Sequence, residues 1–214
     1  MNTALAHMRA HPEELERTPT DTMRRLQDYL KTNGQGTGNK VTAHEACVAE
    51  CLEAHGFVLT PRGTTPTADG LYYWYQLQGS QQAGDFLVFE VVGGVKTFER
   101  ILDAKHSNGM SIYLNDGTFE PGTIYIVSFT RCLDRIRGQR KKPRQNVCFI
   151  GCGEDIFTDT DREAMTRWRS ILRDLNQTTT DTDHLRLYAR SANQYDCRRF
   201  TPEFADHCWS RIPA

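Results

Sequence analysis

Two aspartates and a lysine stand at matching positions of a predicted β-hairpin. Residues 84–107 read GDFLVFEVVGGVKTFERILDAKHS, in which two apolar runs flank a Gly-Gly turn. Such a turn joins antiparallel strands, so facing residues have numbers that sum to about 187 or 188. This register places Asp85 opposite Asp103, with Cβ atoms about 4.5–5.5 Å apart. The two-residue alternation of a strand puts Lys105 on the face of Asp103.

This arrangement suits metal-assisted chemistry on a phosphate. Two facing carboxylates repel each other at neutral pH, and burying them without compensation is costly. A bound divalent cation relieves the repulsion, and hard oxygen ligands favour Mg2+ over zinc. A lysine beside the metal can hold a water aimed at phosphorus and help to deprotonate it, while the metal stabilises charge on the leaving oxygen. The predicted site therefore has Asp85 and Asp103 as metal ligands and Lys105 at the water.

The same residues resemble the PD-(D/E)xK nuclease superfamily, to which most type II restriction endonucleases belong. The pattern here is Gly84-Asp85, seventeen residues, then Asp103-Ala104-Lys105, with glycine for the family's proline and aspartate for its commoner glutamate. In that family the first acid opens the second core strand and the triplet lies on the third. The resemblance covers residues 42–176 and implies a restriction-endonuclease-like core, Mg2+ dependence and phosphodiester hydrolysis. It also implies that the Ala104 carbonyl is a further metal ligand.

Four further residues near these acids have two interpretations each. Glu45 lies before the predicted sheet, where some family members supply an additional metal ligand or orienting acid, but it also completes a capping box with Thr42. His106 is next along the strand and points to the other face by alternation, which suits packing or a phosphate contact better than a general base. Ser107 and Asn108 either bond a phosphate or form the turn.

A dense basic segment follows the predicted hairpin. Residues 131–144, RCLDRIRGQRKKPR, hold seven basic residues and one acid, so they carry +6 while the rest of the chain sums to −7. These cations repel one another unless an anion is present, and the internal glycine and proline indicate a loop. We expect this loop to bind DNA phosphates and guanine edges, the alternative being a merely solvated loop. Its candidate DNA-binding residues are Arg135, Arg137, Arg140, Lys141, Lys142 and Arg144.

Helix and strand patterns predict the elements that position these residues. Helices are expected from Thr20 to Asn33, after the N-cap Thr42 up to Gly56, and after the N-cap Thr160 with apolar positions 165, 168, 172 and 175. Strands are expected at 72–78, 85–92, 98–105, 124–129 and 147–151. This order describes an α/β (α+β) fold with a mixed central β-sheet flanked by helices. Residues 1–40 are assigned to an N-terminal helical or connector segment and residues 41–214 to the main domain.

The composition excludes several protein classes. The chain has 214 residues, 38% of them apolar and 25% charged, and a net charge of −1, which rules out disorder, collagen and coiled coil. No stretch approaches the ~20 apolar residues of a membrane span, and the N-terminus lacks a secretory signal, so a cytoplasmic, intracellular location is expected. The seven cysteines are then expected to stay reduced. The CxxxC pairs at 47/51 and 148/152 lack a tight zinc knuckle, which favours buried thiols.

These features favour a Mg2+-dependent, site-specific endonuclease for double-stranded DNA, of the type II restriction kind. Two copies are needed to cut both strands of a symmetric site, so a homodimer is expected. Three alternatives remain open. The first is another nuclease of the same fold, such as a repair nickase, a junction resolvase or an exonuclease. The second is a non-catalytic nucleic-acid-binding protein, and the third is a cysteine-based zinc module.

Overall fold

A mixed six-stranded sheet forms the centre of the fold. The structure is a computed structural model, and it describes residues 1–33, 40–76, 84–115, 119–133, 144–178 and 192–213. The strands are β1 (Phe57–Leu59), β2 (Gly70–Tyr75), β3 (Phe86–Val92), β4 (Val95–Ser107), β5 (Ser111–Asn115), β6 (Thr123–Cys132), β7 (Arg144–Cys152) and β8 (Ala192–Asp196). The helical elements are α1 (Asn2–Ala10), η1 (Pro12–Glu16), α2 (Thr20–Thr32), α3 (Ala43–Ala54), α4 (Gly153–Ile156), α5 (Asp159–Thr178), η3 (Cys197–Arg199) and α6 (Pro202–Ser210).

The strand order of the sheet is β1-β2-β3-β4-β6-β7. Strands β2, β3 and β4 form an antiparallel meander, β6 lies parallel to β4, and β7 is antiparallel to β6. Each of the five strands expected from the sequence belongs to this sheet. The expected class, α+β with a mixed sheet flanked by helices, is therefore confirmed.

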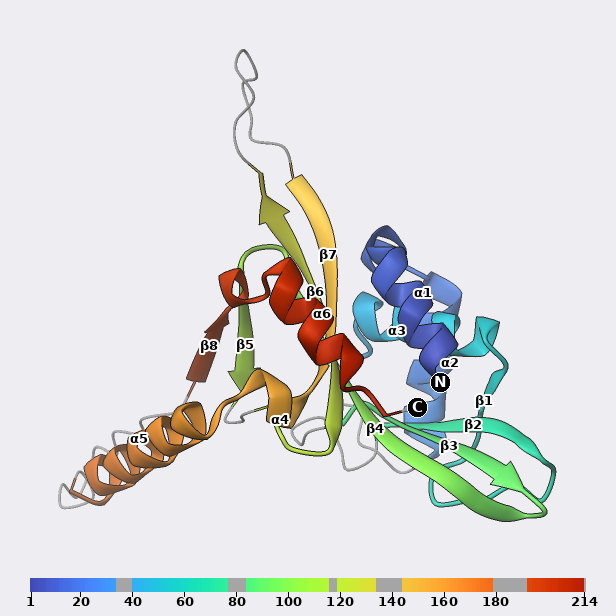
Figure 1. Cartoon of the computed structure of the whole chain (residues 1–214). Helices are drawn as coiled ribbons and strands as arrows, with labels where there is room; N and C mark the ends of the chain where they lie inside the picture. Colours follow the sequence, from blue (N-terminus) through green and yellow to red (C-terminus); the bar gives the residue numbers. More distant parts are fainter. Residues whose placement is uncertain (34–39, 77–83, 116–118, 134–143, 179–191, 214) are drawn as a thin grey trace.

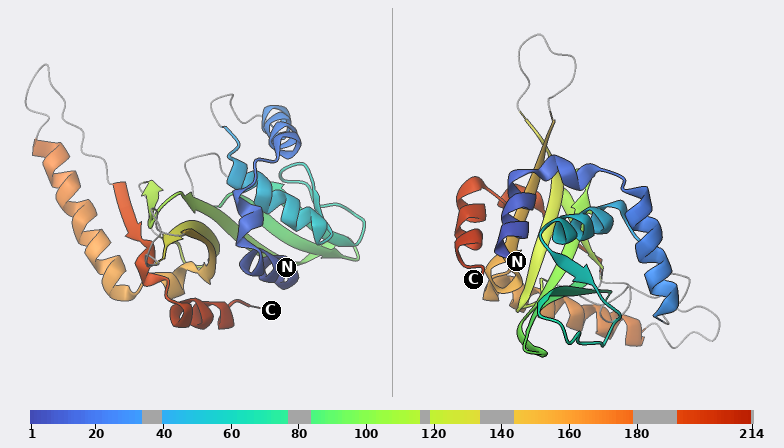
Figure 2. Two further views of the ribbon diagram at one scale, coloured as in Figure 1. Left: turned by 90° about the horizontal axis from the view of Figure 1, so that it is seen from above. Right: turned by 90° about the vertical axis from the view of Figure 1, so that its right-hand side faces the viewer.

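Both faces of the sheet are covered, and each face has its own apolar core. Helices α1, α2 and α3 cover one face, where residues such as Leu5, Leu26 and Val48 pack against Phe86 and Leu102 of the strands (Figure 1). The opposite face carries α4, α6 and the small β5–β8 sheet, with a core that includes Phe119, Phe149 and Phe200 (Figure 2). No helix among the described residues is long and apolar enough to cross a membrane.

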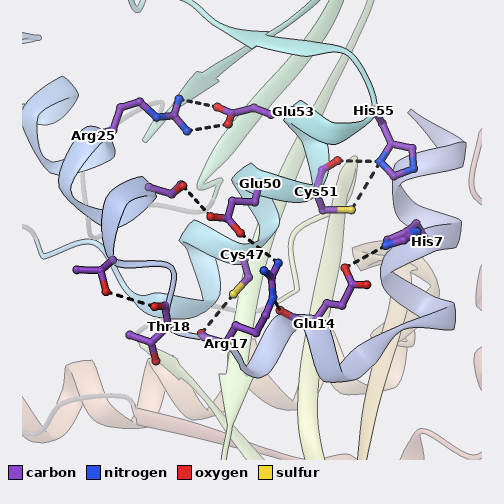
Figure 3. A network of polar contacts seen from close by, with 12 residues as sticks. His7, Glu14, Arg17, Thr18, Arg25, Cys47, Glu50, Cys51, Glu53 and His55 are labelled. Carbon is purple, nitrogen blue, oxygen red and sulfur yellow. Dashed lines mark hydrogen bonds and ion pairs between the residues drawn. The ribbon is translucent and has the colours of Figure 1, made fainter.

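The N-terminal helices are joined to α3 by polar contacts as well as by the shared core. Arg25 of α2 makes a two-bonded ion pair with Glu53 of α3, at 2.6 and 2.7 Å. Arg17 lies 3.1 Å from the Glu50 carboxylate, and its carbonyl accepts a bond from the Cys47 thiol (Figure 3). The segment before residue 40 thus contributes side chains to the same core as α3 and the sheet.

The structure corrects the start of the third predicted helix. Thr158, not Thr160, caps α5: its hydroxyl accepts from the Asp161 amide at 3.2 Å, and the Asp161 carboxylate accepts from the Thr158 amide at 3.0 Å. Both threonines precede an acid by three residues, so the sequence signal occurs twice and does not distinguish the two starts. Two residues of the expected apolar face, Trp168 and Leu175, are 47% and 51% exposed, whereas Leu172 is buried.

One glycine is required by the packing of α4 against the chain that precedes β6. A Cβ atom at Gly153 would lie 2.0 Å from the carbonyl oxygen of Glu120, a backbone atom that cannot move aside easily. We expect Gly153→Ala to destabilise the fold by about 3 kcal/mol, the upper range of overpacking effects. Urea denaturation measures this, with Gly109→Ala as the control, because its Cβ would meet nothing closer than 3.9 Å. Equal stability of the two variants would contradict the packing described.

Candidate active site

The β3–β4 hairpin brings Asp85 and Asp103 together as its register predicts. Phe86 pairs with Leu102, and the pairing continues to Val92 and Val95 at the turn, with one irregularity between residues 90 and 91. Asp85 immediately precedes Phe86 and Asp103 immediately follows Leu102, so the two acids stand across the open end of the hairpin. The local sequence sets this arrangement, because the glycine turn fixes the register of both strands.

Each aspartate is held by the backbone of the opposite strand. Asp85 Oδ2 accepts a hydrogen bond from the Ala104 amide at 2.9 Å, and Asp103 Oδ2 accepts one from the Gly84 amide at 3.4 Å. The Lys105 ammonium donates to Asp103 Oδ1, as the alternation along β4 predicts. Asp103 is buried, whereas Asp85 is partly exposed. The three side chains therefore form a small, ordered acidic site with one cation at its edge.

Gly84 has a backbone conformation that requires glycine. Its φ is +106°, a conformation that only glycine adopts without strain, and a Cβ there would lie 2.7 Å from Ile101 Cγ2. This conformation leaves the Gly84 amide available to bond Asp103. A proline at position 84 would lack that donor.

Glu45 completes the capping box that the sequence indicates, and its carboxylate also contacts a buried tyrosine. Its amide donates to Thr42 Oγ1 and its Oε2 accepts from the Thr42 amide, each at 3.2 Å, which completes the capping box of α3. The same Oε2 also accepts from the hydroxyl of Tyr75, a fully buried residue of β2. The carboxylate is buried, and its charge interacts with the charges of Lys105 and Asp85.

The site contains more acidic groups than basic groups, and the pKa values of several of these groups are shifted accordingly. Burial raises the pKa of Asp85 well above its ordinary value, and the neighbouring charges of Asp103 and Glu45 raise it further. Burial also raises the pKa of Glu45. Burial alone would lower the pKa of Lys105, but the attraction of Asp103, Asp85 and Glu45 outweighs it, so this pKa is raised. Lys105 therefore stays charged at neutral pH, and the site retains excess negative charge when its acids ionise.

The donor set fits a hard divalent cation held by two carboxylates. Among the described residues no group of three or more His, Cys, Asp and Glu side chains could hold a metal ion together. Mg2+ does not need such a group, since it is commonly bound by one or two carboxylates plus waters and substrate phosphate oxygens. Asp85 and Asp103 provide that pair, and the excess negative charge gives them a reason to bind it. Glu45 then fits the orienting acid better than a direct ligand.

The other predicted site residues lie at different distances from this pair. His106 faces α3: its Nδ1 is 2.9 Å from Ser128 Oγ, and its Nε2 is 3.3 Å from Asn108 Oδ1. Ser107 has the turn role, because its Oγ accepts from the Gly109 amide at 3.1 Å. His106 and Asn108 line a pocket that Lys105 also lines, so they are near the site without bonding to its aspartates.

The basic segment is described only at its ends. Arg135, Arg137, Arg140, Lys141 and Lys142 lie outside the described residues. Arg144 is exposed and pairs with Cys132, seven residues along β6 from the Tyr125 that pairs with Asp103. At about 3.3 Å per residue this separation is roughly 20 Å, so Arg144 is not part of the acidic site.

Two tyrosines that lie next to the acids of the site were not predicted from the sequence. Tyr75 donates to Glu45, and Tyr125, opposite Asp103 on β6, has its pKa raised by burial and by the Asp103 charge. Tyrosine in a predicted strand indicates packing first, and only the pairing of distant strands shows which acid each one meets.

All seven cysteines are unbridged thiols, and burial raises the pKa of Cys47 to about 11 and that of Cys51 to about 12.

Comparisons with known proteins add no further assignment. No protein-family model matches the chain, and neither the curated proteins nor the solved structures include a match. The case for a function rests on the residues and their geometry alone.

The bond from Tyr75 to Glu45 gives a prediction for this site. We expect Tyr75→Phe to lower the free energy of unfolding by about 1–1.5 kcal/mol, because a buried hydrogen bond is lost. The pKa of Glu45 should rise further, since that bond favours the ionised carboxylate. Urea denaturation and carbon NMR titration of Glu45 measure the two effects. Tyr72→Phe is the control, because the Tyr72 hydroxyl makes an exposed bond to Ala68; an equal loss in both variants would contradict the role of Tyr75.

Proposed function

We propose that this protein is a Mg2+-dependent phosphodiester hydrolase that cuts DNA. The observation that carries the proposal is the convergence of Asp85, Asp103 and Lys105 at the open end of the β3–β4 hairpin, with buried Glu45 beside them. The raised pKa values of Asp85 and Glu45, beside a charged lysine, are typical of a catalytic site rather than of a stabilising ion pair. The PD-(D/E)xK pattern supports the same conclusion, and with it a restriction-endonuclease-like core built on α3, β2, β3, β4 and β6.

Each residue of the site has its own role in the proposed reaction. Asp85 and Asp103, together with the Ala104 carbonyl, would hold Mg2+, which when bound polarises the phosphate and neutralises charge on the leaving oxygen. Lys105 holds and orients the attacking water; its raised pKa keeps it protonated, so it acts as a donor and a positive charge rather than as a base. Glu45 attracts the Lys105 ammonium and helps to fix its position. No covalent intermediate with the protein is involved.

Site-specific cleavage of double-stranded DNA by a homodimer, as in type II restriction enzymes, is the form of the activity that we propose. The basic segment with its charge of +6 supports a polyanionic substrate. A two-fold homodimer would present two equivalent sites to the two strands of a symmetric sequence. The fork of an arginine side chain suits both phosphate contacts and guanine edges, so the arginines of this segment would supply both positioning and specificity.

The products of cleavage test the form of the activity. Purified protein is incubated with several long, unmethylated DNAs in the presence of Mg2+ or EDTA, and the products are separated on a gel. Discrete fragments with Mg2+ alone are expected. A smear or progressive shortening would instead indicate a non-specific or end-directed nuclease, and nicked circles a nickase. Intact DNA throughout, with binding that is insensitive to Mg2+ but sensitive to salt, would replace the proposal with a non-catalytic nucleic-acid-binding protein.

A further inference from the structure

A pocket of about 550 Å³ lies beside Lys105, on the side of the sheet that α3 covers. Its walls come from three segments: residues 15–18 at the end of η1 and just after it, residues 42–45 at the start of α3, and residues 104–106 of β4 with Asn108 just after the strand. Glu45, Ala104 and Lys105 belong both to this pocket and to the candidate active site. The pocket therefore borders the candidate active site.

One buried polar atom in the pocket walls makes no hydrogen bond. It is Glu16 Oε1, one of the buried side-chain atoms without a hydrogen-bond partner among the described residues. Glu16 Oε1 is 3.7 Å from His106 Nδ1, which is an ion-pair distance but not a hydrogen bond. An unpaired buried oxygen is destabilising, so Glu16 Oε1 points to a ligand that donates a hydrogen bond to it.

A buried serine hydroxyl holds the two imidazole rings of the pocket in place. Ser128 of β6 is buried, and its Oγ lies 2.9 Å from His106 Nδ1 and 3.2 Å from His44 Nδ1. One hydroxyl therefore orders both rings, whose centroids are 5.4 Å apart. Burial lowers the pKa of His44 to about 4, and the charges of His106 and Lys105 act the same way, although the carbonyls of Ile126 and Leu15 oppose them. His44 is consequently a neutral, fixed ring at neutral pH.

The chemistry of these walls favours a nucleobase over a phosphate. The pocket is lined by Arg17 and Lys105 as well as by Glu16 and Glu45, so its walls carry charges of both signs. A phosphodiester has no proton to donate to Glu16 Oε1, whereas the amino and imino groups of a base donate well to an unpaired carboxylate oxygen. Flat histidine rings provide faces on which an unpaired base stacks. The volume is in the range of about 300–1,000 Å³ that holds small organic ligands, and a base can enter it only when it is unpaired, at an end, in a single strand, or extruded from a duplex.

We infer that this pocket is a nucleobase subsite, which takes one unpaired base of the substrate strand next to the scissile phosphate, with Glu16 accepting from a base N–H. The position relative to the scissile phosphate rests on the proposed function. His106 contacts the base, and Ser128 and His44 are positioning residues that hold the His106 ring.

Nucleotide binding tests the inference without any need for cleavage. The probe is 2′-deoxyguanosine 5′-monophosphate, titrated into the full chain in calorimetry and in NMR spectra of the histidine rings. We expect binding that shifts the His106 and His44 signals and that weakens at least 10-fold in Glu16→Gln. Glu13→Gln is the matched control, because Glu13 lies on the same short helix, is mainly exposed and is outside the pocket. Thermal melting of each variant shows that the fold is retained.

Three results would overturn the inference. The first is no nucleotide binding at millimolar probe, which would mean that the pocket holds water only. The second is equal affinity in wild type and Glu16→Gln, and the third is inorganic phosphate binding as tightly as the nucleotide, with the same histidine shifts. Failure of the proposed function has a different signature: the nucleotide binds in the pocket and Glu16→Gln weakens it, but DNA stays intact with Mg2+.

Discussion

Alanine at Asp85, Asp103 or Lys105 is expected to lower the rate of DNA cleavage by about 10³-fold or more. Each change removes an interaction that develops fully only as charge appears on the phosphate, and interactions of this kind supply several kcal/mol, with 1.36 kcal/mol for each factor of ten. The measurement is the single-turnover rate at saturating Mg2+, with circular dichroism spectra to confirm that each variant is folded.

Matched controls separate this effect from general damage. Asp21 and Lys31 both lie on α2, their side chains are 92% and 55% exposed, and each is in a surface ion pair. Alanine at either position should leave the cleavage rate within about twofold of wild type, because exposed ion pairs contribute little. Full activity in a folded Asp85, Asp103 or Lys105 variant would remove that residue from the catalytic site.

Asp85→Asn is expected to make the protein more stable at neutral pH while removing its activity. The pKa values of Asp85 and Glu45 are raised in the folded state, so the folded protein holds protons that the unfolded chain releases. The two carboxyl groups therefore stabilise the fold below their unfolded pKa values of about 3.9 and 4.3. This stabilisation is lost as the pH rises through the raised pKa values of the folded state. An uncharged amide at 85 removes the repulsion with Asp103.

Thermal melting at pH 5 and pH 8 measures this effect. At pH 8 the melting temperature of Asp85→Asn should exceed that of wild type by about 2–4 °C, which is roughly 1 kcal/mol for a chain of this size. The difference should shrink at pH 5. A lower melting temperature for Asp85→Asn at both pH values would show that the ionised carboxylate stabilises the fold, contrary to the electrostatics described.

Added Mg2+ should make the wild type more stable than Asp85→Asn. If 10 mM Mg2+ binds with a dissociation constant of about 1 mM, it stabilises the wild type by about 1.4 kcal/mol. Asp85→Asn should gain much less, since it lacks one of the two carboxylates that we propose as ligands. An equal gain for both proteins would place the ion elsewhere.

The part of the site that depends on local sequence could be predicted, and the part that depends on distant pairing could not. A Gly-Gly turn fixes the register of adjacent strands, so Asp85, Asp103 and Lys105 were placed correctly relative to one another. The capping box of Glu45 is also a local pattern. Tyr75, Tyr125 and Ser128 reach the site only through the docking of α3 on the sheet and the parallel pairing of β4 with β6, which no short pattern encodes.

The same distinction applies to the fold. Five of the six strands of the main sheet have dense apolar runs and were predicted, whereas β1, α1, β5, β8 and α6 were not. Helix α1 buries only Ala4, Leu5 and Met8 among polar neighbours, and such a short apolar stripe is a weak signal. Strand β5 pairs with β8, about eighty residues later, so its extended conformation depends on a distant partner.

The most direct test of the central claim is the position of a bound divalent ion. Mn2+ takes the hard oxygen ligands that Mg2+ takes, and its anomalous scattering locates it in a crystal of the protein. The peak should lie within about 2.5 Å of a carboxylate oxygen of both Asp85 and Asp103 and should be absent in crystals of Asp85→Asn. A peak at another site, or none at a Mn2+ concentration that supports DNA cleavage, would contradict the assignment of this carboxylate pair as the catalytic metal site.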